Sequence, residues 1–385
     1  MIVVQKFGGS SVADPEKLGQ VADRVAATVK TGRRVVVVVS AMGKTTDELL
    51  ALARSVAPES TGGPPRRELD MLLSTGERIS MALLAMALEA RGLSAISFTG
   101  SQSGILTNDR HSGARIIEVR PIRIEDELER DKVVIVAGFQ GMSYKREITT
   151  LGRGGSDTTA VALAAALGAD CEIYSDVDGV YSADPRVVPD AHRLPAIGYG
   201  EMQELAEHGA KVINAQAVKW ARENGVVIRA RATGGGGSEA GETRIGDPNG
   251  AAHAGGGALA LAVTGSRITR VEPAAESARA LLALLAEERV ALRHACPRCL
   301  RLSRDDVPDW PRIERRLTSA GAEVSERGEV TLVGPEIGSD AALIGRALAL
   351  AGPVVEFESA PLRLSLEVDP ARVDEVTRAL HTLCG

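Results

Sequence analysis

The chain has 385 residues, of which 44% are apolar and 25% are charged, and its formal net charge is −6. This length is typical of two or three domains, each with enough apolar residues to form a core. The acidic balance and an aromatic content of 3% argue against a nucleic-acid-binding protein, which needs a basic surface or a stacking platform.

The sequence has neither a long apolar run nor the features of a leader. Because no stretch of about 18 apolar residues is present, we expect no membrane span. Residues 1–6 lack the basic and apolar regions of a signal peptide. The four cysteines do not form a disulfide framework in a chain this long. We therefore expect a protein of the reducing cytoplasm.

Two of the cysteines, Cys296 and Cys299, stand at a spacing found in metal sites. One such pair supplies only two ligands, however, and no matching pair follows it. We favour two ordinary cysteines on or near a strand over a structural zinc, and we predict no metal held by protein side chains.

Short β-branched runs alternate with longer helical patterns in residues 1–230. Residues 35–39 are five consecutive valines, a pattern typical of a strand that is covered on both faces in a parallel sheet. The alternation predicts an α/β fold with helices on both faces of a sheet, and ligands then bind at the carboxyl ends of the strands. The predicted strands are 2–5, 35–39, 133–137, 172–174 and 226–228, and the predicted helices are 14–30, 77–91, 157–167 and 200–224.

The composition changes after residue 232. Residues 233–257 are rich in glycine and show no periodicity, which predicts a flexible linker. Short strands and amphipathic helices follow in residues 258–385 and predict one or two small α+β units. The expected domains are therefore 1–232 and 258–385, joined by 233–257.

The segment that follows the first predicted strand has the composition of an anion site. Gly8 and Gly9 allow the backbone to approach an anion closely, and Lys6 adds a positive charge suited to a phosphoryl group in transfer. An ordinary strand–turn–helix connection explains the same residues without function. Residues 40–47 follow the valine strand and offer hydroxyls and amides, although Thr45 or Thr46 is also a good helix N-cap.

A second glycine-rich segment, residues 150–160, carries Arg153 and Asp157. An arginine fork holds carboxylates in a bidentate manner, and the start of the following helix adds positive potential. Asp157 and Glu77 each have a structural explanation as first-turn acids, but Glu77 is also placed to neutralise a substrate ammonium. Residues 175–186 combine carboxylates, a glycine turn and Arg186, which is equally typical of a solvated turn.

Taken together, these segments resemble the aspartokinases of the amino acid kinase family. GRGGSD, SDVDGVY and ADPR are typical of this branch, and the resemblance extends over residues 1–230. It implies an amino acid kinase-like, mainly parallel sheet sandwiched by helices. The implied reaction transfers the γ-phosphate of ATP to the β-carboxylate of L-aspartate, giving 4-phospho-L-aspartate, with Mg²⁺ on the ATP phosphates. The matching segments are 6–11, 40–50, 71–80, 98–105, 136–141, 149–166 and 173–186.

The resemblance also assigns roles residue by residue. The catalytic positions are Lys6, Arg153 and Asp157. The substrate-binding positions are Ser40, Thr45, Glu77, Arg153, Gly154, Gly155 and Ser156. The nucleotide-binding positions are Lys6, Gly8, Gly9, Ser10, Ser175, Asp176, Tyr181, Asp184, Arg186 and Lys211.

Residues 258–385 resemble the ACT-type regulatory units of this family, but in a degenerate form. The family's effector loop is missing near Pro273, and Pro361 stands at a strand entry, where it removes a backbone donor. We expect a homodimer formed through this region, with reduced or absent feedback inhibition by lysine or threonine.

Two other functions stay open at this point. A retuned pocket would phosphorylate another small amino acid carboxylate, since Glu77 and Arg153 fit an α-amino acid without fixing its length. A non-catalytic regulatory subunit is the second alternative. Loss of Lys6 or Asp157 would mark it, and both are present.

Overall fold

The computed structural model describes residues 1–58, 63–152, 154–234, 241–247, 260–274, 278–288, 290–304, 307 and 310–385. These residues form two compact units. Unit 1 comprises Met1–Val180, Leu194–Tyr199 and Val212–Gly250, and unit 2 comprises Tyr181–Arg193, Gly200–Lys211 and Ala251–Gly385.

Unit 1 is built on an eight-stranded sheet in the order β10-β12-β11-β9-β1-β2-β6-β3. All neighbouring pairs are parallel except β11 and β12. The mainly parallel α/β sheet predicted from the sequence is therefore confirmed. The strands are β1 (Ile2–Phe7), β2 (Arg34–Val39), β3 (Ala95–Phe98), β6 (Val133–Ala137), β9 (Asp170–Ser175), β10 (Ala196–Ile197), β11 (Ile228–Ala232) and β12 (Glu242–Ile245).

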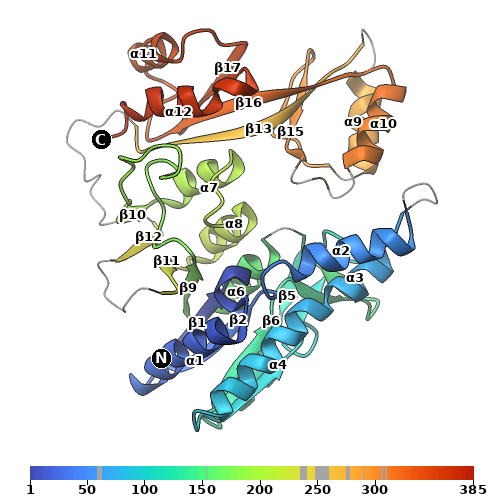
Figure 1. Cartoon of the computed structure of the whole chain (residues 1–385), viewed down its shortest axis with the longest axis vertical. Helices are drawn as coiled ribbons and strands as arrows, with labels where there is room; N and C mark the ends of the chain where they lie inside the picture. Colours follow the sequence, from blue (N-terminus) through green and yellow to red (C-terminus); the bar gives the residue numbers. More distant parts are fainter. Residues whose placement is uncertain are drawn as a thin grey trace. The chain divides into compact units, whose positions relative to one another are not determined.

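The valine run of β2 forms the centre of this sheet. Val35, Val37 and Val39 belong to the core formed with α1 (Pro15–Lys30) and α4 (Thr75–Glu89). The intervening Val36 and Val38 are fully buried too, on the opposite face, because successive side chains of a strand alternate. Figure 1 shows α1 and α4 running together along the sheet, while α6 (Gly155–Ala166) and α8 (Ala215–Asn224) pack against each other.

Local signals explain where several helices begin and end. Asp14 caps α1 by accepting a hydrogen bond from the Lys17 N–H (2.9 Å), and Pro15 occupies the first helical position. The single helix expected over 200–224 is instead two helices, α7 (Tyr199–Glu207) and α8. The break follows from Gly209, with φ +128°, and from Asn214, whose side chain caps α8.

The remaining elements of unit 1 surround the main sheet. A four-stranded sheet has the order β5-β4-β7-β8. Residues Arg66–Glu89, which include α3 and α4, are long and apolar enough to cross a membrane by length and composition, but 44% of the apolar window is buried inside the fold. The elements are η1 (Gly9–Val12), α2 (Thr45–Val56), α3 (Arg66–Leu73), β4 (Ile105–Thr107), β5 (Ile116–Val119), α5 (Ile122–Leu128), β7 (Gln140–Ser143) and β8 (Ile148–Thr150).

Unit 2 contains a six-stranded antiparallel sheet in the order β14-β15-β13-β16-β18-β17. The smaller α+β region predicted from the sequence is confirmed. Its strands are β13 (Ala262–Glu272), β14 (His294–Ala295), β15 (Leu300–Leu302), β16 (Glu323–Val333), β17 (Glu356–Ala360) and β18 (Arg363–Val368). Its helices, besides α7, are α9 (Ala278–Glu287), α10 (Trp310–Ser319), α11 (Ala341–Ala351), η5 (Pro370–Arg372) and α12 (Val373–His381).

The described residues of unit 2 form two separate hydrophobic cores on this sheet. The core beneath α11 and α12 includes Leu343 and Leu380, and the core beneath α9 and α10 includes Leu285 and Leu317. Strands β13 and β16, each 11 residues long, run through both halves (Figure 1). The two small α+β arrangements are therefore fused through continuous strands.

Part of the glycine-rich segment that was predicted to be a linker forms a strand. Residues Glu242–Ile245 form β12, which pairs with β10 and β11. The short sequence ETRI carries only one apolar residue, so its strand character depends on neighbours that are distant in the chain. Thr243 illustrates this, since its hydroxyl donates to the Leu194 carbonyl at 2.6 Å.

Candidate active site

Lys6 and Asp157 form the centre of the candidate site in unit 1. Lys6 lies at the carboxyl end of β1, and its Nζ is 2.7 Å from Oδ1 of Asp157, in the first turn of α6. The two side chains are only 12% and 10% exposed. The other carboxylate oxygen, Oδ2, accepts the backbone N–H of Asn214 at 3.1 Å. The ammonium is therefore held in one place at the edge where parallel strands end.

Backbone hydrogen bonds join the first predicted loop to two others. The Gly8 N–H donates to the Tyr174 carbonyl at the end of β9 (3.2 Å), and the Gly43 N–H donates to the Gly9 carbonyl (3.0 Å). A Cβ at Gly9 would lie 2.8 Å from the carbonyl oxygen of Ala41, so only glycine fits there. The amide of Gly8 thus closes the loop, and Ser10 is exposed at its tip.

Glu77, in the first turn of α4, lies beside the loop after β2. Its side chain is buried, and Oε1 accepts the Ala41 N–H at 3.1 Å. Oε2 is buried with no hydrogen-bond partner among the described residues. Burial raises the pKa of this carboxyl to about 7, although the Glu77 and Ala41 amides partly oppose the effect. A buried carboxylate with a free oxygen is well suited to an ammonium ligand.

Ser40 and Thr45 belong to the same loop. The Ser40 N–H donates to the Phe7 carbonyl (3.2 Å), which fixes Ser40 next to the end of β1. The Thr45 hydroxyl donates to the Met42 carbonyl (2.7 Å), and Gly76 lies against Thr45 and Ala41. The loop after β2 and the start of α4 therefore pack as one block.

The N-terminus of α6 follows the glycine-rich loop. Gly154 is its N-cap with φ +66°, and no side chain caps the helix. Backbone carbonyls engage part of the first turn instead, because the Gly155 N–H donates to Gly152 (3.1 Å) and the Asp157 N–H donates to Gly154 (3.0 Å). A Cβ on Gly154 would lie 2.3 Å from the Asn214 side chain, and one on Gly155 would lie 2.8 Å from Leu151. Ser156 is buried in the first turn. Arg153 lies outside the described residues.

The predicted nucleotide-binding residues fall in both units. Ser175 and Asp176, which follow β9, belong to unit 1 together with the loop of Gly8. Asp184 and Arg186, with Tyr181 and Lys211, belong to unit 2. Asp184 and Arg186 form a mutual ion pair (2.7 Å), and this pairing lowers the pKa of the Asp184 carboxyl.

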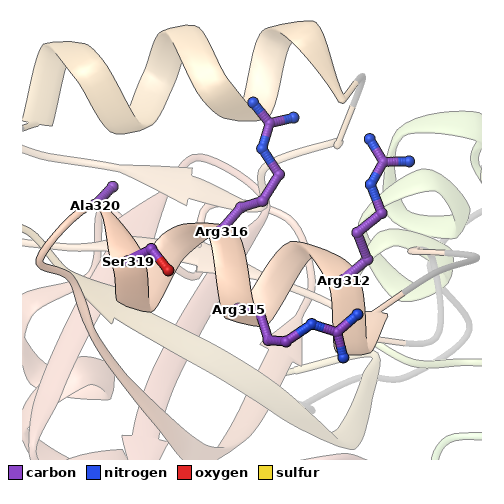
Figure 2. A pocket seen from close by; sticks show the side chains of 5 residues that line it. All are labelled: Arg312, Arg315, Arg316, Ser319 and Ala320. Atoms are coloured by element: carbon purple, nitrogen blue, oxygen red, sulfur yellow. The ribbon is translucent and has the colours of Figure 1, made fainter. Parts of the chain in front are cut away.

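The described residues of unit 2 line at least two hollows. Lys211 lines one of about 590 Å³ together with Arg267, Arg293 and Arg304, which gives that hollow a basic wall. The other, of about 440 Å³, lies over α10 and is shown in Figure 2. There Arg312 and Arg316 extend to the same side, and Glu288 pairs with both. None of the predicted site residues lines this second hollow.

Two residues of the site neighbourhood were not predicted from the sequence. Asn214 holds Asp157 through its backbone N–H, and only its position before a helix marks it as a cap. Asp70, fully buried in α3, accepts the Thr150 hydroxyl (2.6 Å) and the Ser112 N–H (3.0 Å). No clear signal in the sequence marks it, because α3 also contains Arg66, Arg67 and Glu68. Through Thr150, Asp70 anchors the strand before the glycine-rich loop.

The fold and these loops agree with the comparison to known proteins. Residues 1–231 match the model of the amino acid kinase family. The chain therefore belongs to the amino acid kinase family, whose fold unit 1 displays.

Aspartokinases are among the proteins that this chain is similar to. The aspartokinase of Corynebacterium efficiens is 58% identical over 234 residues, which is 60% of this chain and 55% of that protein. The chain thus spans little more than half the length of the curated relatives that it matches.

Solved structures extend the likeness to the whole fold. Aspartate kinase from Synechocystis is 34% identical with a TM-score of 0.58, covering 99% of this chain and 69% of that one. Aspartokinase III of E. coli, solved with aspartate and ADP, is 24% identical with a TM-score of 0.82, covering 100% of this chain and 99% of that one.

Proposed function

We propose that this protein transfers the γ-phosphate of ATP to the β-carboxylate of L-aspartate, giving 4-phospho-L-aspartate and ADP. The observation that carries the proposal is the Lys6–Asp157 ion pair, which joins the end of β1 to the first turn of α6 beside two glycine loops. The 58% identity to an aspartokinase over 234 residues supports aspartate as the acceptor.

The chemistry needs no general base. A carboxylate is already an anion at neutral pH, so its oxygen attacks the γ-phosphorus directly and the bond to the β–γ bridging oxygen breaks. No proton moves in this step. The barrier comes from bringing two anions into line, and positive groups must offset that repulsion. The Lys6 ammonium supplies such a charge, and Asp157 holds it in position at 2.7 Å.

The amino group of the substrate is assigned to Glu77. Its Oε2 is buried without a partner, and the loop of Ser40 and Thr45 adjoins it through the Ala41 N–H. An ammonium bound there lowers the pKa of the Glu77 carboxyl and stabilises its charged form. Ser40, Thr45, Gly154, Gly155 and Ser156 remain proposed substrate contacts, together with Arg153.

Mg²⁺ fits this site as a companion of the nucleotide. Both oxygens of Asp157 are already engaged, by Lys6 and by Asn214. Among the described residues, the one group of three potential ligands combines a histidine with two cysteines, so no cage of carboxylates is present. The ion prefers oxygen ligands and, when bound on the ATP phosphates, neutralises part of their charge. Lys6, Gly8, Gly9, Ser10, Ser175, Asp176, Tyr181, Asp184, Arg186 and Lys211 are the proposed nucleotide contacts.

The C-terminal region is proposed to be a degenerate ACT-like module. Under this proposal, residues 1–232 carry catalysis, 233–257 connect, and 258–385 form a homodimer with reduced or absent lysine and threonine inhibition. The antiparallel sheet with two helix-covered cores supports a pair of related α+β units.

ADP release with a panel of amino acids tests the acceptor. We expect turnover with L-aspartate and little with L-glutamate or with aspartate amides. Lys6→Ala serves as the inactive control. Lys17→Ala, which removes an exposed lysine of α1, is the matched control and should keep full activity. Equal turnover with glutamate contradicts the assignment of aspartate, and ATP hydrolysis that ignores every acceptor contradicts the whole proposal.

A further inference from the structure

A hairpin in unit 2 brings together one histidine and two cysteines. Strands β14 and β15 pair antiparallel, with His294 opposite Arg301, and the Cys296 N–H donates to the Cys299 carbonyl at 2.9 Å to close the turn. Potential ligand atoms of His294, Cys296 and Cys299 all lie within 4.8 Å of one another. Cys299 is buried, and the other two are partly accessible to solvent.

We propose that His294, Cys296 and Cys299 bind one Zn²⁺ ion. The two sulfur atoms are 3.5 Å apart. Two thiolates on a tetrahedral zinc, at about 2.3 Å each, are about 3.8 Å apart, so the pair needs almost no rearrangement. The Cys299 N–H already donates to the sulfur of Cys296 at 3.3 Å. Such a donor stabilises a thiolate in a tight turn.

The histidine is oriented as a metal-binding histidine commonly is. Its Nδ1 lies 2.7 Å from Oε2 of Glu358, a carboxylate on β17. With that nitrogen engaged, the opposite ring nitrogen, Nε2, is left as the ligand, which is the carboxylate–histidine–zinc arrangement. Glu358 is itself held by Arg363 at 2.5 Å. Glu358 is therefore a positioning residue for His294.

The carboxylate beside Cys299 does not supply a fourth protein ligand. Oε2 of Glu356 lies 3.9 Å from the sulfur of Cys299, but the same oxygen is engaged by Arg270 (2.9 Å) and by Arg301 (3.0 Å). The described residues thus supply three ligands and leave a fourth position open to water, which the partial exposure of His294 and Cys296 permits.

The chemistry of the three ligands favours zinc over magnesium or calcium. Two sulfur atoms and one imidazole are softer than the oxygen ligands of Mg²⁺ or Ca²⁺ and match zinc in composition and number. One Zn²⁺ enters as both thiols lose their protons to solvent, so the occupied site is neutral. The bound ion would clamp a hairpin whose β14 strand has only two residues.

Metal content of the intact chain tests the proposal. Protein purified without chelator, or dialysed against Zn²⁺, is expected to contain one zinc per chain by elemental analysis. Cys296→Ser and Cys299→Ser should lose it, whereas Cys384→Ser, the matched control outside the cluster, should keep it. Glu358→Gln should weaken zinc binding by roughly 10- to 100-fold in competition with a chromophoric chelator.

A second measurement does not depend on the folding of any variant. Co²⁺ added to the metal-free wild-type chain should give the thiolate-to-metal charge-transfer band and the strong visible bands of a tetrahedral site. Absence of zinc together with absence of these bands overturns the proposal. A Cys296–Cys299 disulfide in protein that takes up no zinc even after reduction overturns it as well.

Discussion

Replacement of Glu77 by glutamine tests the buried carboxylate that we assign to the substrate amino group. Glutamine keeps the shape of the side chain and removes its charge. Burial raises the pKa of Glu77 from its ordinary value of 4.5 to about 7. Each pH unit between the folded and unfolded values corresponds to about 1.4 kcal/mol, so the carboxylate costs the free protein on the order of 3 kcal/mol.

Protonation of Glu77 differs between the folded and the unfolded protein, and this difference makes the free energy of unfolding depend on pH. Between about pH 4.5 and pH 7 the folded protein keeps a proton on Glu77 that the unfolded chain releases. The contribution of Glu77 to the free energy of unfolding therefore falls as the pH rises through that window and stays low above it. Glu77→Gln should remove this slope, so the variant gains stability over wild type between pH 5 and pH 8, by roughly 2 to 3 kcal/mol.

Urea unfolding at the two pH values, without substrates, measures this gain. Glu125→Gln, a change of an exposed glutamate on α5, is the matched control and should leave the pH slope unchanged. In kinetics, the KM for aspartate of the wild type should fall as the pH rises through about 7. Glu77→Gln should raise KM and abolish that dependence. Parallel stability profiles for the variant and the wild type, or an unchanged KM, would refute the reasoning.

Three further predictions concern other parts of the molecule. Lys6→Ala should lower kcat roughly 10²-fold or more, because a charge aimed at the transferring group is lost, while Lys17→Ala leaves it unchanged; equal kcat values would remove Lys6 from catalysis. Gly154→Ala should lower the free energy of unfolding more than Gly168→Ala does. Both glycines have positive φ, but only at Gly154 would the new Cβ collide with Asn214; equal losses in urea would mean that the collision is relieved. Lysine or threonine at millimolar concentration should not change the rate of ADP release, and strong inhibition by either would exclude a relaxed regulatory region.

Features that depend on neighbours in sequence could be predicted. Five consecutive valines mark a strand buried on both faces, and β2 is buried that way. Glycines beside Lys6 and before Asp157 mark turns at strand ends, because only glycine tolerates the close approaches and positive φ that occur there.

Features that depend on partners distant in the chain could not be predicted from the sequence. The Lys6–Asp157 pair joins residues that meet only through the order of the parallel strands. β12 lies in a segment predicted as linker, because its pairing with β10 and β11 leaves no periodic signal in four residues. The raised pKa of Glu77 likewise depends on burial that α4 and the loop after β2 create together.

The cysteine pair shows why the proposed metal site could be predicted only in part from the sequence. The spacing of Cys296 and Cys299 was visible in the sequence, but two ligands alone argued against a metal. The third member of the cluster, His294, stands only two residues earlier. Its significance depends on a hairpin turn and on Glu358, which approaches from another strand.

Trapping of the acyl phosphate with hydroxylamine tests the central claim most directly. The purified chain, supplied with ATP, Mg²⁺ and L-aspartate, should produce aspartyl hydroxamate in step with ADP, and Lys6→Ala should not. Release of ADP without hydroxamate, or no consumption of ATP beside aspartate, would contradict phosphoryl transfer to a carboxylate at this site.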